Sequence, residues 1–573
     1  MKKFILLLPA FILVLATSVS AQVTLDPAVA VNAQIAADTT ADGSRTETTY
    51  LAEAGQYYYF DGTLETNFDL QILGPDGDTW IFDQEDPPVF FQFPAADGSA
   101  RDMINLNEGG SVELRNAIFT GLLPNDVNIS SIVRNFAGYK MIFDNNVFTD
   151  IRDHTTRSTG ALEEFTVTNN LFINMDRRGG SPFGGMPFRI DAEVLELTFE
   201  NNTLFNGART FGNGGDFFTS EMTEIHNTLV NQQVNGHELH WFSAKQANNI
   251  YYNWSWRGRD LRTNGYEAPF TTFETHAGVK NNLDSVAIYQ GFNAFYLDPA
   301  ISNYWEDTIN PMRADDSAHV RQSYLWNVDV DSTISADDNF TIGKNYWQLD
   351  PNFDVNPTKI DSMNGWNLAN WTDATNYSDW RITPPITWNA DGTPNKNWPI
   401  EMDLSYSNEN LVGTDGLPLG DLNWFPDAKA DYMANRDTYL AALEDSMTTA
   451  TFVYEPGDSL SAFITMDNLP TSIESNNSNI PNKFYLSENY PNPFNPATTI
   501  KFGLPSQSKV TLSVFNVLGQ KVFEFTEGSL SAGTHSVRFD ASQLSSGMYI
   551  YRIQATDASG TNHISSKKMM LIK

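Results

Sequence analysis

A short unit recurs through the first half of the chain: two asparagines, a variable residue, two apolar residues, and then Asn or Asp. It stands at residues 145–150, 169–174, 201–206, 226–231 (where His226 replaces the first asparagine) and 248–253, with weaker copies around Asn116 and Asn282. The second asparagines of successive copies lie 22 to 33 residues apart. An alternating polar and apolar run precedes each pair, so one repeat comprises a strand, a sharp turn, a second strand and a variable loop.

This period is too short for a propeller blade and fits one coil of a parallel β-helix. Stacked coils would align the second asparagines in a ladder of side-chain amides, and asparagine also tolerates the left-handed conformation of a sharp turn. The repeat pattern resembles the right-handed parallel β-helix of pectate lyases and related carbohydrate-active proteins, in architecture and over roughly residues 50–300. We therefore expect an all-β chain whose residues 22–299 form such a β-helix. An array of β-sandwiches is the alternative fold.

Residues 300–454 are expected to continue or cap the β-helix. The periodicity weakens there, and residues 300–425 hold nine of the 13 tryptophans. These rings could stack on sugars, but packing over the β-helix is the commoner use of such side chains. An amphipathic helix is predicted at 427–447, with Met433, Leu440, Leu443 and Met447 on one face, where it would cover an open end of the coil stack.

The C-terminal end has a different pattern. From Phe484 onward, short alternating runs separated by glycines predict a small Ig-like antiparallel β-sandwich. The stretches 489–496 (NYPNPFNP), 514–522 (VFNVLGQKV), 546–551 (SGMYIY) and 567–573 (KKMMLIK) resemble the type A sorting domain of the type IX secretion system. The resemblance covers 484–573 and implies recognition by an outer-membrane translocon, followed by release or attachment at the surface of a Bacteroidetes-type cell. The Ser- and Asn-rich stretch 455–483 predicts a flexible linker.

The N-terminus has the form of a signal peptide over residues 1–21: two lysines, a short apolar run, and small residues before Gln22. We expect no transmembrane segment in the mature protein, because no other apolar stretch approaches spanning length. With 70 Asp+Glu against 35 Lys+Arg, nucleic acid is not expected as a partner. The absence of cysteine excludes cysteine-based metal, redox and nucleophilic chemistry.

One stretch has nearly the spacing of a calcium loop. Acidic and polar side chains recur at alternate positions over 327–338, but Ser332 occupies the position that requires glycine. A strand with one acidic face explains the same alternation. Asp329 and Asp331 are the candidate ligands in either case, and Ca²⁺ is the only cofactor that we expect.

Arginine recurs six to eight residues after the second asparagine of several repeats. The residues at this offset are Arg152, Arg177, Arg178, Arg209 and Arg257, and Arg259 lies close by. Equal offsets in a β-helix place side chains on one face, about 4.8 Å apart per coil. Arginine makes paired hydrogen bonds to carboxylates and sulfates, so such a stripe suits an acidic polysaccharide. The alternative is that these arginines only pair with neighbouring aspartates.

Two functions remain open. In the first, the chain is a polysaccharide lyase or glycoside hydrolase. Arg152, Arg209, Arg257 and Arg259 would then bind substrate, while Asp176, Arg177 and Arg178, in a long loop, would act as base and neutralise charge during elimination. In the second, the chain is a non-catalytic surface adhesin or binding scaffold, because no established catalytic motif is present.

Overall fold

The computed structural model describes residues 22–38, 47–75, 79–125, 127–175, 185–212, 219–233, 243–254, 288–304, 345–372, 380–449 and, with short gaps, 484–572, together with a few isolated positions and short strands between these ranges. The chain divides into two compact units, 1–471 and 472–573. We call the first unit the body and the second the C-terminal unit.

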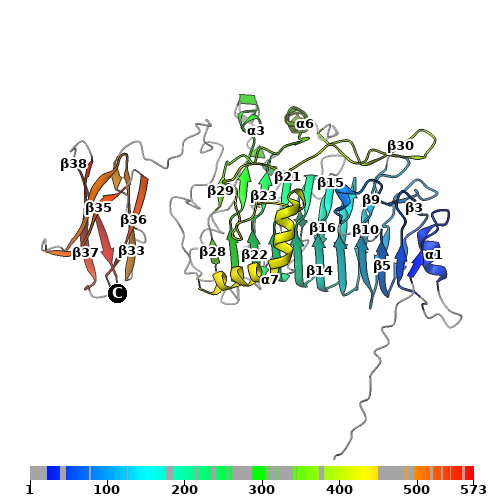
Figure 1. Ribbon diagram of the computed structural model, residues 1–573, viewed down its shortest axis with the longest axis horizontal. Helices are drawn as coiled ribbons and strands as arrows, with labels where there is room; N and C mark the ends of the chain where they lie inside the picture. The colour runs from blue at the N-terminus through cyan, green and yellow to red at the C-terminus, as the bar shows by residue number, and fades with distance from the viewer. Residues whose placement is uncertain are drawn as a thin grey trace, which may run out of the picture. The chain divides into compact units, whose positions relative to one another are not determined.

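The body is a stack of coils whose strands form three parallel sheets (Figure 1). Sheet 1 contains β1 (Gln22–Thr24), β2 (Thr49–Leu51), β5 (Asp69–Leu73), β8 (Ser111–Arg115), β11 (Lys140–Asp144), β14 (Leu162–Thr168), β17 (Val194–Glu200), β20 (Thr219–Ile225), β22 (Trp241–Ala247), β25 (Ala287–Gly291) and β28 (Phe340–Ile342). Sheet 2 contains β3 (Tyr57–Phe60), β6 (Val89–Gln92), β9 (Ile118–Thr120), β12 (Val147–Thr149), β15 (Leu171–Met175), β18 (Thr203–Gly207), β21 (Thr228–Gln232), β23 (Ile250–Tyr252), β26 (Ala294–Tyr296) and β29 (Tyr346–Trp347). Sheet 3 contains β4 (Leu64–Thr66), β7 (Ile104–Leu106), β10 (Ser131–Asn135), β13 (His154–Ser158), β16 (Met186–Ile190) and β19 (Phe211–Gly212).

Each full coil runs from sheet 3 to sheet 1, around a sharp corner into sheet 2, and through a loop back to sheet 3, as in β10, β11 and β12. The prediction of a parallel β-helix is thereby confirmed. The interior is filled by columns of in-register apolar side chains. Phe90, Phe119, Phe148 and Phe172 stack with ring centroids 5.0, 5.5 and 5.3 Å apart, and all four are fully buried. Such columns supply the burial that a single coil could not provide alone.

The asparagine ladder lies at the corner between sheets 1 and 2. From Asn146 through Asn170, Asn202 and Asn227 to Asn249, each side-chain amide donates to the Oδ1 of the next asparagine over 3.0–3.1 Å. The backbone N–H of each residue donates to the same Oδ1 atom over 2.8–3.0 Å. The ladder predicted from the spacing is therefore confirmed for these five positions.

For the two weaker copies of the repeat, the predicted ladder positions, Asn116 and Asn282, are wrong. In the strand register, Ile118 is opposite Val147. Asn116 is therefore the neighbour of Asn145, the first residue of its pair. Ala117 occupies the ladder position in that coil. Beyond Asn249 the ladder continues through Asn293 and Asn345. Asn282, the position expected from the sequence, lies outside the described residues.

The first residue of each pair forms the corner of the coil, whereas the second forms the ladder. Asn145, Asn169, Asn201, His226 and Asn248 all have φ between 52° and 62°. Asparagine occupies this left-handed region at little cost, which explains why it precedes the ladder residue. A second left-handed column lies at or next to the ends of β12, β15, β18, β21 and β23, at Asp150, Asn174, Asn206, Asn231 and Asn253. These five strands of sheet 2 therefore lie between two sharp corners.

The chain folds back over the β-helix after β29. We call residues 355–425 the return segment; it includes α6 (Ile360–Thr372), the β30 (Ile386–Trp388) and β31 (Pro394–Lys396) hairpin, and η5 (Leu422–Trp424). Its contacts reach progressively earlier coils: Thr358 accepts from Asn231, Ile382 from Asn174, and Trp388 donates to the Leu122 carbonyl. The segment then returns, and Thr414 bonds Asn248. In Figure 1, α6 and β30 lie along the same side of the stack.

The remaining elements of the body lie at its end and along its flank. The helix α1 (Val31–Ala37) packs on β3 and β4, with Val31 and Ile35 fully buried. The helix α7 (Pro426–Thr449) crosses the flank and contacts β25 and β28, with Tyr432 and Leu443 buried and Met433 exposed. Other short elements are η1 (Ile81–Asp83), α3 (Pro299–Tyr304) and the antiparallel pair β24 (Arg259–Asp260) and β27 (His319–Val320).

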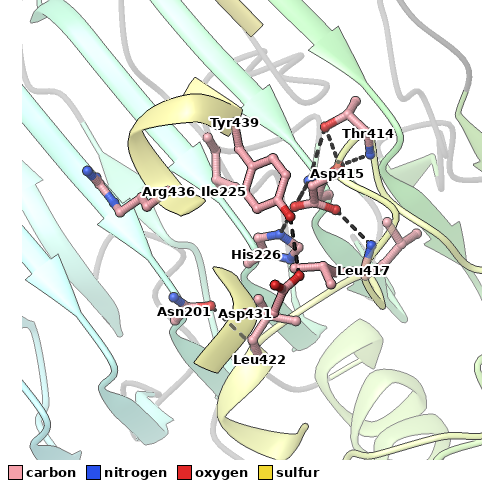
Figure 2. Close-up of polar contacts among 12 residues, drawn as sticks. Asn201, Ile225, His226, Thr414, Asp415, Leu417, Leu422, Asp431, Arg436 and Tyr439 are labelled. Carbon is pink, nitrogen blue, oxygen red and sulfur yellow. Dashed lines mark hydrogen bonds and ion pairs between the residues drawn. The ribbon is translucent and has the colours of Figure 1, made fainter. Parts of the chain in front are cut away.

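Buried polar contacts fasten the return segment to the ladder corner (Figure 2). The His226 ring lies between the Asp415 carboxylate, at 2.7 Å from Nε2, and the Gly420 carbonyl, at 3.2 Å from Nδ1. Asp421 accepts from Thr203 Oγ1, at 2.8 Å, and from the backbone of Asn423, at 2.9 Å. In α7, Arg436 binds Glu200 through two of its nitrogens. Removal of any one partner would leave a buried polar group without a hydrogen-bond partner.

Replacing Asp421 by Asn should flatten the pH dependence of the body's stability. Complete burial raises the pKa of Asp421 to about 7, although hydrogen bonds from Asn423 and Thr203 and the charge of Lys429 oppose this shift. The unfolded carboxyl titrates near 3.9, so between about 4 and 7 the folded chain holds a proton that the unfolded chain lacks. Stability from this group therefore falls as pH rises through that window.

The measurement is the urea midpoint of the wild type and of Asp421→Asn at pH 5 and pH 8, followed by tryptophan fluorescence. All 13 tryptophans lie within the first 424 residues, so this signal reports on the body. The wild type should lose more stability between the two pH values than the variant does. An equal loss in both proteins would contradict the assignment.

The C-terminal unit is an antiparallel β-sandwich, as predicted. One sheet contains β32 (Tyr485–Leu486), β33 (Ala497–Leu504) and β36 (Gly533–Asp540). The other contains β35 (Lys521–Leu530), β34 (Ser508–Asn516), β37 (Gly547–Asp557) and β38 (Asn562–Leu571). Their inner faces share one core, in which Ile500, Phe502, Leu512 and Tyr551 are fully buried. The predicted linker, 455–483, lies outside the described residues.

Candidate functional site

Most of the site residues predicted from the sequence fall outside the described part of the chain. This applies to Asp176, Arg177, Arg178, Arg257, Asp329 and Asp331, and to the side chain of Arg259, whose backbone lies in β24. Two predicted residues are described. The Arg152 side chain is 42% exposed and pairs with Asp153 over 2.8 Å, whereas Arg209 is only 3% exposed. These two arginines therefore lie in different environments, and the rest of the predicted stripe stays a prediction.

A different row of arginines lies on sheet 3. Arg134 of β10, Arg157 of β13 and Arg189 of β16 are direct partners in the parallel register. Their side chains are 27%, 32% and 27% exposed. Because neighbouring strands lie about 4.8 Å apart, the three guanidinium groups rise from the sheet at regular steps along the stack.

Aspartates hold these arginines in place. The Asp191 carboxylate accepts from Arg157 Nε at 3.1 Å and from Arg189 Nε at 2.9 Å. Asp102 lies 3.7 Å from Arg134 Nη1. These carboxylates are more buried than the arginines: the Asp102 and Asp191 side chains are 18% and 11% exposed. The Asp191 carboxylate thereby orients the guanidinium groups of Arg157 and Arg189, and among the described residues no acceptor is found for Arg189 Nη1 or Nη2.

Among the described residues, the part of this face from β10 to β16 has more arginines than carboxylates. Arg134, Arg152, Arg157 and Arg189 lie near Asp102, Asp153 and Asp191, whereas Glu65 of β4 adds a negative charge at the far end of the same row. His154 adds no charge here, because burial, assisted by the charges of Arg189 and Arg157, lowers its pKa to about 3 and outweighs the opposing effect of Asp153 and Asp191. Within the described residues, the row from β10 to β16 is therefore weakly cationic on an acidic protein.

A second polar group resembles a catalytic pair but is buried away from solvent and substrate. His226 and Asp415 have the spacing of a proton-transfer pair, yet their side chains are 0% and 2% exposed. Burial would raise the pKa of Asp415, but the hydrogen bond and charge of His226, with the Leu417 N–H, lower it overall. Figure 2 shows Thr414 and Leu417 of the return segment and Tyr439 of α7 beside this pair. Its role is to fasten these elements.

The described part of the chain contains no cluster of side chains suited to a metal ion. Among those residues, no group of three or more His, Asp or Glu side chains is arranged to hold an ion. The predicted calcium ligands, Asp329 and Asp331, lie outside them. Nor does any helix in the described ranges combine the length and apolarity needed to cross a membrane.

The arginine row on sheet 3 had a sequence signal that was missed. Arg134, Arg157 and Arg189 lie twelve or thirteen residues before the second asparagine of their coils. The offset that predicted the other arginines runs forward from the asparagine, into the loops of variable length between sheets 2 and 3. Counting backward crosses sheet 1 and a short turn, which keep nearly constant length.

Comparison with known proteins bears on the C-terminal unit. Residues 488–567 match the family model described as "Secretion system C-terminal sorting domain". No curated protein matches the chain.

Three solved structures each resemble 16% of the chain. They are dimeric latent PorU from Porphyromonas gingivalis (17% identity, 9% of that chain, TM-score 0.14), CopC from Methylosinus trichosporium OB3b (15%, 93%, 0.13) and the PmoD soluble domain from Methylocystis sp. ATCC 49242 (18%, 90%, 0.12). Likenesses at these TM-scores carry no argument about function.

The family match and the antiparallel sandwich agree with the resemblance noted in the sequence. Residues 488–567 therefore belong to the C-terminal sorting domain family of the type IX secretion system, and the chain is an exported parallel β-helix protein of the cell surface or the medium.

Proposed function

We propose that the exported body binds an acidic polysaccharide along the outer face of sheet 3. The observation that supports this proposal is the in-register row of Arg134, Arg157 and Arg189. Arginine at equal steps matches a polymer whose carboxylates or sulfates also repeat at equal steps. Since the row crosses successive coils, the polymer would run parallel to the axis of the stack.

The arrangement of the aspartates favours binding over a purely structural ion-pair network. Arg189 engages Asp191 through Nε, and within the described ranges its two terminal nitrogens have no acceptor. A guanidinium group oriented in this way loses little entropy when it binds an anion, because its position is already fixed. Catalysis by Asp176, Arg177 and Arg178 and binding by Arg257 and Arg259 remain part of the proposal.

The second candidate function is a non-catalytic adhesin or scaffold. It is favoured by the fact that each arginine of the row already has a carboxylate partner. The two candidates differ in what happens to a bound uronate polymer. A lyase would release products with unsaturated ends, detected by their ultraviolet absorbance, whereas a scaffold would release none.

Replacing Arg157 and Arg189 together by alanine should weaken binding of polygalacturonate, alginate or a sulfated glycan at least tenfold. Each charged hydrogen bond contributes about 1.5–3 kcal/mol, and about 1.4 kcal/mol corresponds to a factor of ten. The affinity should also fall with added salt, because the contact is ionic. Titration calorimetry on the full chain measures both effects.

The matched control is Arg115→Ala on sheet 1. Arg115 is also partly exposed, at 41%, and also pairs with two carboxylates, Glu113 and Asp144. Its removal should leave the affinity unchanged. If the wild type binds none of these polymers, or if the two variants weaken binding equally, sheet 3 is not the site and the scaffold function stands.

A further inference from the structure

Three polar side chains meet where the return segment passes into α7. Asp421 and Asn423 lie at the turn of η5, and Lys429 lies in the first turn of α7. Asp421 is fully buried, Asn423 is 4% exposed, and Lys429 is partly buried. A carboxyl group, an amide group and an amine are therefore gathered in a region with little access to water.

The amide group of Asn423 lies between the other two groups. The Lys429 amine donates to its side-chain carbonyl oxygen. Helical side chains lean toward the N-terminal end of their helix, so the lysine reaches back from α7 to this residue. On the other side, Asn423 Nδ2 donates to Asp421 Oδ1 over 2.7 Å and to the Asn201 carbonyl over 2.9 Å. The carbonyl carbon of the amide is thus within reach of the amine, and its nitrogen contacts the carboxyl group.

Aromatic rings limit the access of water to these groups. The Trp424 ring lies against Trp80 and Phe82, with ring centroids 4.6 and 5.0 Å away. Its Nε1 donates to Thr203 Oγ1 over 2.8 Å, and the same hydroxyl donates to the Asp421 carboxyl group over 2.8 Å. The rings therefore adjoin the carboxyl group. A dry site strengthens the electrostatic contacts within it and keeps water from competing for reactive groups.

Burial favours the uncharged forms of both the amine and the carboxyl group. It raises the pKa of Asp421 to about 7, so near neutral pH much of this carboxyl group carries a proton. Burial also lowers the pKa of Lys429, which outweighs the opposing charges of four carboxylates, those of Asp421, Asp144, Asp83 and Glu200. An uncharged amine is a nucleophile, and a protonated carboxyl group is a general acid.

We propose that the chain forms an isopeptide bond between the side chains of Lys429 and Asn423, with Asp421 as the acid and base. The lysine Nζ attacks the asparagine Cγ, a C–N bond forms between them, and the bond from Cγ to Nδ2 breaks. Asp421 gives its proton to the departing Nδ2 and recovers one from the lysine nitrogen, so ammonia leaves and the carboxyl group is unchanged. Folding alone brings the three groups together, so the step needs no other enzyme or cofactor.

Mass spectrometry of the full chain, unfolded in denaturant and digested with trypsin, tests this proposal. Trypsin does not cleave after a lysine whose amine is bonded, so peptide 430–436 should be lost and peptide 397–436 should appear. The longer peptide should be lighter than its sequence predicts by the mass of one ammonia molecule. Fragment ions from breaks between residues 423 and 429 should be absent, because the bond closes a ring there.

Three variants assign the roles of the side chains. Lys429→Arg keeps the positive charge but removes the amine, so its digest should contain peptide 430–436. Asp421→Asn keeps both bonded residues, and its cross-linked fraction should fall at least tenfold. The matched control, Asp427→Asn, makes the same change at an exposed position of α7 and should stay cross-linked like the wild type.

The wild-type digest decides the proposal whether or not a variant folds. Cleavage after Lys429 without loss of ammonia would overturn it and leave Asp421 only as the cap of η5. Loss of ammonia with normal cleavage would overturn it as well, because a succinimide at Asn423 loses the same mass. If Asp421→Asn kept the wild-type cross-linked fraction, Asp421 would not be the acid and base.

Discussion

A chain that ends before Phe484 should remain in the periplasm. Residues 488–567 match the sorting domain family, and they fold with a core of their own, separate from that of the body. Their deletion removes the export signal and leaves the contacts of the β-helix in place. We expect the surface and secreted fractions to fall by more than tenfold, measured by cell fractionation and immunoblotting of wild-type and truncated chains.

The control deletes residues 475–479 within the predicted linker, which shortens the chain but removes no strand of either unit. Its export should match that of the wild type. In the reciprocal experiment, residues 472–573 joined to an unrelated periplasmic protein should carry that protein out of the cell. Surface delivery of the truncated chain at the wild-type level would show that the body holds its own export signal.

Replacing Asn202 by alanine should destabilise the body by on the order of 3 kcal/mol. Its Nδ2 donates to the Val167 carbonyl at 2.9 Å and to Asn227 Oδ1 at 3.0 Å, and its Oδ1 accepts the Asn170 N–H at 3.0 Å. All of these groups are buried, so alanine leaves a backbone carbonyl and an N–H without partners. The urea midpoint of the tryptophan signal should fall accordingly.

The control is Asn410→Ala, at an exposed turn of the return segment. It should shift the midpoint by no more than a few tenths of a kcal/mol, because water replaces its lost hydrogen bonds. The ladder would not be a main source of stability if both variants showed the same midpoint.

The sequence predicted the coil architecture because a β-helix repeats one set of local requirements. A left-handed corner such as Asn145 and a ladder amide such as Asn146 recur in five successive coils, so their spacing identified the junction of sheets 1 and 2. The prediction failed where another residue type stands at one of these positions. Ala117 replaces a ladder asparagine, and Phe292 takes a left-handed corner, with φ of 56°. A pattern of residue types does not reveal such substitutions.

The candidate site was less predictable, because the position of each sheet 3 strand relative to its neighbours depends on the loop that precedes it. The Arg157 and Arg189 pairing across Asp191 requires the register of sheet 3, and the loops that precede these strands differ in length. The return segment was also beyond prediction. Its contacts, such as Ile382 with Asn174, join residues 208 positions apart and show no periodicity.

The return segment also links coils that are not neighbours in the stack. A repeat protein whose units contact only their neighbours can gain or lose a unit at little cost. Here Thr358 is anchored at Asn231 and Lys396 at Asp86, on coils far apart in the stack. One inserted coil would separate these anchors by a further 4.8 Å or so, while the chain that joins them keeps its length. A change in the number of coils between these anchors would therefore break one of the two contacts unless residues 355–425 changed with it.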